Sequence, residues 1–179
     1  ADVDGSNATQ YKVTASPLDG LKVGADYYEV GNEASNVSQS KSGGNYYLQY
    51  AMGNFKVGYT KGFVEPGKNT NKYRTNVADT ASALNGLRYE SDGIGIEFAV
   101  NDQLSVSFTE EDFDRTNATM AATASTSTKT TVTSSQTTIM AAYNIGGATL
   151  GLSLVDTDNS DYTDSRDETK SIISLALAF

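Results

Sequence analysis

Apolar and polar residues alternate along most of this chain with a period of two, which is typical of β-strands whose two faces meet different surroundings. Residues 169–179 show the pattern most clearly. From Ile173 onward one face of this segment is wholly apolar and consists of Ile173, Leu175, Leu177 and Phe179. A strand of roughly 9–11 residues crosses a bilayer at a tilt, with lipid on one side and water on the other. The pattern of this segment also fits the last strand of a soluble β-sandwich.

Nine alternating segments follow one another, and we predict no helix of useful length between them. The segments are Thr9–Ser16, Leu21–Tyr28, Asn45–Ala51, Phe55–Lys61, Leu87–Val100, Leu104–Thr109, Thr131–Asn144, Thr149–Val155 and Thr169–Phe179. Within Leu87–Val100 the apolar positions change from odd to even numbers, which predicts a β-bulge near Ser91–Gly93, where glycine permits one.

The connections between these segments alternate in length. The short ones are Pro17–Gly20, Met52–Asn54, Asn101–Gln103 and Asn144–Ala148, and the long polar ones are Gly31–Gly44, Val64–Gly86, Thr116–Thr130 and Asp156–Glu168. Outer-membrane barrels have short periplasmic turns and long external loops, whereas a soluble meander has no reason to keep every long loop at one end. The pattern therefore predicts an all-β fold, an antiparallel transmembrane β-barrel, as a single domain over residues 1–179.

Composition excludes several function classes. The chain has 179 residues, a net charge of −9, and neither cysteine nor histidine. The acidity argues against a nucleic-acid partner. Without cysteine or histidine no thiol chemistry is available, and no acid pair has a nucleophile and base beside it. We therefore expect neither an enzyme nor a cofactor.

The ordered hairpins over Tyr11–Tyr28, Tyr46–Tyr59, Ile94–Phe108 and Ile139–Leu154, followed by the terminal strand, resemble the C-terminal part of a Gram-negative outer-membrane porin of the general-diffusion type. The resemblance implies a barrel of 16 or a similar number of strands, a water-filled pore, outer-membrane lipid around it, and a homotrimer. It also implies that Ile173, Leu175, Leu177 and Phe179 form the terminal signal that the barrel-assembly machinery reads.

The strand count departs from the porin family. Nine strands place the two chain ends on opposite sides of a membrane, whereas single-chain bacterial barrels have an even strand number. We therefore expect these residues to be the later part of a barrel whose N-terminal half lies in the same chain or in a separate fragment. That half would carry the inward-folded constriction loop.

Charged residues at alternate positions are predicted to line the pore. This set is Lys12, Lys22, Asp26, Lys56, Arg88, Glu97 and Lys170. Lys12 and Lys22 flank one short turn and Lys56 follows the next, so we expect a basic patch near the inner mouth that tunes charge selectivity. Ordinary solvated charge on a wet face is the equal alternative.

The long loops are acidic. Asp156, Asp158 and Asp161 echo the spacing of a calcium loop and are weak candidates for a metal site. The segment lacks the central glycine and the distal glutamate of that motif, so solvation or cation focusing at the mouth is favoured over metal binding.

The sequence thus predicts an outer-membrane porin for passive diffusion of small hydrophilic solutes and ions. Two alternatives stay open: a non-conducting barrel that serves as an adhesin or anchor through its long loops, and a soluble β-sandwich binding module.

Overall fold

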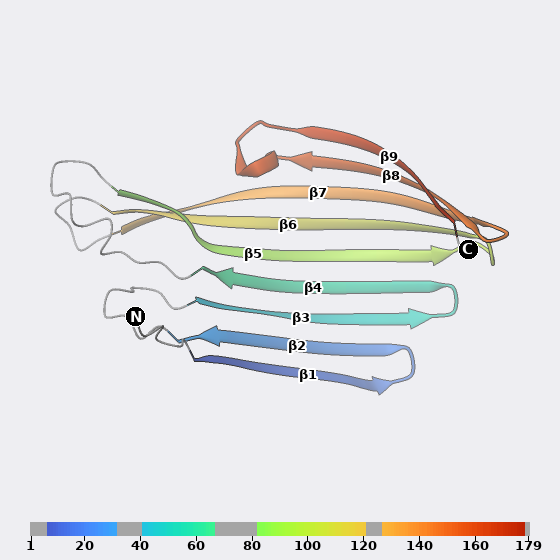
Figure 1. Cartoon of the computed structure of the whole chain (residues 1–179), viewed down its shortest axis with the longest axis horizontal. Coiled ribbons are helices and arrows are strands. Elements are labelled where there is room, and N and C mark those ends of the chain that lie inside the picture. Colours follow the sequence, from blue (N-terminus) through green and yellow to red (C-terminus); the bar gives the residue numbers. More distant parts are fainter. Residues whose placement is uncertain (1–6, 32–40, 67–81, 121–126, 178–179) are drawn as a thin grey trace, which may run out of the picture.

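The computed structural model describes residues 7–31, 41–66, 82–120 and 127–177 of the chain (Figure 1). Its elements in chain order are β1 (Ala8–Leu18), β2 (Leu21–Val30), β3 (Lys41–Met52), β4 (Phe55–Glu65), β5 (Ser82–Ala99), β6 (Leu104–Met120), β7 (Ser127–Ile145), β8 (Ala148–Asp158), the short 3-10 turn η2 (Ser160–Tyr162) and β9 (Glu168–Leu177).

All nine strands belong to one sheet, and their order in the sheet is their order in the chain. Every neighbouring pair is antiparallel, so β1 and β9 form the two edges (Figure 1). Over the residues that the structure describes, the predicted all-β antiparallel fold of nine strands is confirmed. Among the described residues, no helix is long and apolar enough to cross a membrane.

The four short connections lie together at one end of the sheet (Figure 1). Glycine supplies the positive φ that tight hairpins need, for example Gly20 with φ 78° and Gly53 with φ 58°. The turn before β6 uses a side chain instead, because the Asn101 carboxamide oxygen accepts hydrogen bonds from the backbone N–H groups of Gln103 and Leu104, each at 2.9 Å. Local turn chemistry therefore fixes which strands are neighbours.

Two strands, β6 and β7, extend into a segment that the sequence assigned to a loop. The segment Thr116–Thr130 was predicted to be a loop, but β6 continues to Met120 and β7 begins at Ser127. Threonine is β-branched and favours extended backbone, and the Thr116 and Thr131 hydroxyls lie 3.1 Å apart across the two strands. The described residues of this low-complexity segment therefore form a β-ribbon rather than a loop.

The predicted bulge near Ser91–Gly93 is wrong. The register between β4 and β5 runs without interruption from Val64 opposite Tyr89 to Phe55 opposite Phe98. The irregularity lies earlier, between Leu84 and Arg88, in the pairing of β5 with β6. Tyr89 consequently shares a face with Ser91 and Gly93, and not with Ile94.

The apolar side chains are not packed against another layer within the described residues. Leu152 is 45% exposed and Leu175 is 64% exposed, and every strand belongs to the same single sheet. A β-sandwich would bury these leucines between two sheets. The described part of the chain therefore lacks the second layer that the sandwich alternative requires.

Candidate functional site: the polar face and the β8–β9 loop

Residues paired across neighbouring strands lie on the same face of a sheet, so the register divides the chain into two faces. The apolar face contains rows such as Leu21, Tyr50, Val57, Ile96, Phe108, Ile139 and Leu154. The polar face contains rows such as Thr14, Gly24, Tyr47, Thr60, Gly93, Glu111, Gln136, Thr157 and Glu168.

The large apolar side chains of the apolar face form a band, and the border of this apolar band does not run parallel to the rows of paired residues. Its edge on β2 is Tyr27, and the row of Tyr27 reaches Thr133 on β7. On the apolar face of β7 the band ends at Ile139, six residues further toward the short turns. The border of the band therefore shifts toward the short turns by slightly more than one residue per strand over the five steps from β2 to β7. Because of this shift, the strands cross the apolar band obliquely rather than at a right angle.

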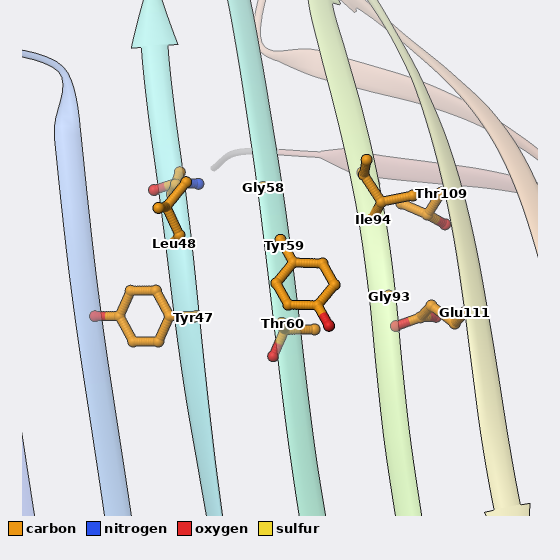
Figure 2. A pocket seen from close by; sticks show the side chains of 11 residues that line it. Tyr47, Leu48, Gly58, Tyr59, Thr60, Gly93, Ile94, Thr109 and Glu111 are labelled. Carbon is orange, nitrogen blue, oxygen red and sulfur yellow. The ribbon is translucent and has the colours of Figure 1, made fainter.

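Glycines hollow the middle of the polar face. Gly58, Gly93 and Gly95 lie beside Thr109 and Glu111 around a depression of about 340 Å³ (Figure 2). Tyr47 reaches from β3 toward β2, and its ring lies over Gly24, so the aromatic side chain lies along the wall (Figure 2). Tyr28 lies over Gly43 in the same manner. Glycine positions thus keep this face open.

Six of the seven predicted pore-lining charges lie on the polar face. They are Lys12, Lys22, Asp26, Lys56, Glu97 and Lys170. Lys56 Nζ forms an ion pair with Glu97 Oε2 at 2.8 Å, and Lys170 Nζ forms one with Glu168 Oε2 at 2.8 Å. Asp26 accepts a hydrogen bond from the Asn45 side chain at 3.0 Å.

The three predicted basic residues do not gather into one patch. Lys12 pairs across the strand with Asp26, which lies four residues, or about 13 Å, from Lys22 along β2. Lys56 is neutralised locally by Glu97. Lys12 and Lys22 flank the same turn, but they do not lie together, because Lys12 lies well inside β1.

Arg88 lies on the apolar face, contrary to prediction. Its guanidinium contacts Glu65 at 2.7 Å and Glu90 at 3.1 Å, and its Cζ lies 4.6 Å from the centre of the Phe63 ring. Phe63 and Glu90 are cross-strand partners in the row of Tyr27. The prediction placed the bulge at the wrong position, and this reversed the side on which Arg88 lies.

The β8–β9 loop, residues 159–167, folds onto the polar face. The Asn159 side-chain amide donates to the Thr133 carbonyl at 3.1 Å, and the hydroxyl of the buried Ser134 donates to the Asp158 carbonyl at 3.2 Å. Ser134 belongs to the polar face of β7, in the row of Phe113. The loop therefore covers the polar side of β7 rather than projecting away from the sheet.

Tyr162 is the residue of this loop that reaches furthest across the sheet. Its ring lies 6.1 Å from that of Tyr89 in an edge-to-face arrangement, and the Arg115 guanidinium carbon lies 4.7 Å from its centre. Arg115 also donates to the Tyr162 carbonyl at 3.3 Å. Tyr89 and Arg115 are cross-strand partners on β5 and β6. Sequence reasoning missed this trio, because Tyr162 stands in an acidic segment without strand periodicity.

Two pKa shifts occur in this region, one in the loop and one at the start of β9. Burial raises the pKa of the Tyr162 hydroxyl above its ordinary value of 10.0. The hydrogen bond and the charge of Lys170 lower the pKa of the Glu168 carboxyl, with a further contribution from the Ser160 hydroxyl. Arg166 contacts both Asp161 at 2.7 Å and Glu168 at 3.1 Å. The loop is thus anchored to β9 through Glu168.

The three candidate metal ligands take part in other contacts. Asp156 accepts a hydrogen bond from the Thr169 hydroxyl at 2.8 Å, and Asp161 is paired with Arg166. Asp158 lies opposite Ser135 on the apolar-face side of β8, beyond the apolar band. No cluster of three or more possible His, Cys, Asp or Glu ligands occurs among the residues that the structure describes.

The terminal segment lies on the apolar face at the edge of the sheet. Ile173 and Leu175 pair with Leu152 and Leu150 of β8, and Ile173 is 77% exposed. Leu177 pairs with Ala148. Phe179, the last member of the predicted assembly signal, lies outside the described residues.

No protein-family model matches this chain, and no curated protein matches it.

Proposed function

We propose that this chain is part of an outer-membrane porin, a trimeric β-barrel through which small hydrophilic solutes and ions diffuse passively. The observation that carries the proposal is the oblique band of exposed apolar side chains on one face of a sheet whose other face is polar. Such a sheet is suited to lipid on one side and water on the other.

The inclination of the band supports a barrel rather than a flat sheet. A descent of slightly more than one residue per strand, with about 3.3 Å per residue and 4.8 Å between strands, gives a tilt of about 40°. Membrane barrels have strand tilts of roughly 35–45°. Strands tilted by this amount keep the apolar band level in the plane of a membrane.

Aromatic residues near both borders of the band further support a bilayer. Phe55 and Phe98 stack near the short turns with ring centres 4.5 Å apart. Tyr27 and Phe63, 6.4 Å apart, lie near the opposite border. Girdles of aromatic residues flank the apolar band of membrane barrels at both interfaces.

Closure of the barrel would require further strands. β1 and β9 run in the same direction. An all-antiparallel barrel therefore needs an odd number of additional strands to join β9 back to β1. Seven would give the 16 strands that the porin resemblance implies. These strands belong to the N-terminal half that we propose completes the barrel, in the same chain or as a separate fragment.

The polar face is suited to conduction. Its glycine hollow leaves room for water, and its charges are spread over the wall, several of them in pairs such as Lys56 with Glu97. Conduction needs groups that attract a solute without holding it. We propose no cofactor, covalent step or nucleic-acid partner in this function.

Adjacent cysteine substitutions would test the proposal, because the chain has no cysteine of its own. We propose to incorporate the full-length protein, as Ser153→Cys and Leu152→Cys variants, into planar bilayers and to add a charged, membrane-impermeant thiol reagent. Ser153 lies on the polar face and Leu152 on the apolar face. The reagent should change the unit conductance of Ser153→Cys alone.

The alternative is a non-conducting barrel that anchors an external adhesive ribbon. The extension of β6 from Glu110 to Met120, beyond Phe108, where the apolar band ends on this strand, favours this alternative. Assembled protein that gives no conductance in the bilayer would reject the porin and support the anchor.

A further inference from the structure

The β8–β9 loop has an unusual backbone. Every non-glycine residue with positive φ in the described part of the chain belongs to it, namely Asn159, Asp161, Tyr162 and Ser165, with φ between 50° and 59°. Residues other than glycine adopt this conformation at a cost of about 1 kcal/mol or more each, and they persist only where their surroundings hold them. Such a loop has a defined conformation that its contacts must stabilise.

Those contacts hold the loop over the polar face. Ser160 N–H donates to the Arg166 carbonyl at 2.6 Å, and Ser165 N–H donates to the Asn159 side-chain oxygen at 3.0 Å. Arg166 joins Asp161 to Glu168 at the start of β9. The loop therefore closes on itself and is tied to β7 and β9.

From this base Tyr162 extends past β7 to the polar face of β6 and β5. Its ring is held between Tyr89 and the Arg115 guanidinium, and Arg115 also bonds the Tyr162 backbone. Tyr89 and Arg115 belong to the row of Tyr28, Gly43 and Val64, at the long-loop end of the wall. In a closed barrel, a ring at this position narrows the passage on the side where the long loops lie.

We propose that the β8–β9 loop is a fixed constriction at the long-loop mouth of the pore, and that Tyr162, positioned by Arg115 and Tyr89, is a size-selecting residue for permeating solutes. This inference rests on the proposed porin function. The β8–β9 loop would narrow the pore at a second place, in addition to the constriction loop expected in the N-terminal half.

Bilayer recordings of the full-length protein and of Tyr162→Ala would test it. The measurements are unit conductance and the size of the largest neutral polymer, from a polyethylene glycol series, that still enters and lowers the current. Tyr162→Ala should accept a larger polymer and raise the conductance by less than about twofold, because one side of the wall is changed.

Two matched variants serve as controls. Tyr162→Phe keeps the ring that Tyr89 and Arg115 contact, so its conductance and polymer limit should equal those of the unmodified protein. Thr163→Ala removes the neighbouring exposed side chain and should also change neither value. Tyr162→Cys tests whether removal of the ring also displaces the loop. If residue 162 still faces the pore, a bulky impermeant thiol reagent attached to it should restore the narrow passage. If the loop has moved away, the reagent should not restore it.

The outcomes distinguish this inference from the function on which it rests. A protein that conducts, but whose Tyr162→Ala and untreated Tyr162→Cys forms match the unmodified channel, overturns the constriction and leaves the porin intact. An unmodified protein that forms no channel rejects the porin function, and the constriction with it.

Discussion

The two faces of the sheet are built from alternate residues of the same strands, yet the requirements on their side chains differ. The apolar face is uniform: any large apolar side chain satisfies it, and Leu150, Leu152 and Leu154 are exposed to nearly the same extent. The polar face is specific, since each position depends on its cross-strand partner, as with Lys56 and Glu97 or Tyr28 and Gly43. Substitutions on the apolar face should therefore depend on hydrophobicity, and those on the polar face on shape and charge.

The largest expected effect comes from placing a charge on the apolar face. Leu152→Lys should destabilise the folded protein in lipid by about 2–4 kcal/mol, because an ammonium group near the middle of the bilayer loses its hydration. Ser153→Lys, one residue away on the polar face, should cost much less. Reversible unfolding in lipid vesicles with increasing denaturant measures both. Equal costs at the two positions would contradict the assignment of lipid to one face and water to the other.

The apolar face is also the part that the sequence predicted best. A period of two is local, so each segment reveals its own alternation, and the leucines of β8 and β9 lie on the predicted side. Arg88 was placed wrongly because the register shift between Leu84 and Arg88 lies outside any clear alternation. Tyr162 was missed because its contacts come from β5 and β6, far away in the chain. Interactions between distant segments leave no periodic signal.

A smaller effect is expected from filling a glycine position on the polar face. In Gly43→Ala the new methyl group would lie 2.6 Å from Tyr28 Cε1, so the tyrosine ring must leave the wall. Overpacking of this kind costs about 1–3 kcal/mol, and the displaced ring should also lower the unit conductance.

Gly58→Ala provides the control for Gly43→Ala. At Gly58 the nearest atom to an added methyl group is the Leu48 carbonyl oxygen at 3.8 Å, which is ordinary contact. Its free energy of unfolding should stay close to that of the unmodified protein. If both variants were equally stable, tyrosine packing on glycine would not shape the wall.

Breaking an ion pair on the polar face should affect stability less and selectivity more. Lys56 and Glu97 are both more than two-fifths exposed, so their pairing contributes about 0.2–1 kcal/mol. Glu97→Gln leaves the lysine charge uncompensated on the pore wall and should move the reversal potential in a salt gradient toward anion preference. Lys56→Gln should move it the opposite way. Shifts in the same direction would place the pair outside the conducting path.

The smallest change should come from acidification, acting through Glu168. The lowered pKa of this carboxyl means that its contacts with Lys170 and Arg166 stabilise the fold above its ordinary pKa of 4.5 and are lost as the pH falls through the lower value of the folded state. Protonation should loosen the anchor of the β8–β9 loop while Arg115 still holds Tyr162. Unit conductance should therefore rise below pH 4.5 by less than in Tyr162→Ala. Glu168→Gln should show this rise already at pH 7 and change less on acidification, which separates Glu168 from the other carboxylates of the polar face. A Glu168→Gln channel with the pH dependence of the unmodified one would show that the loop is held without this carboxylate.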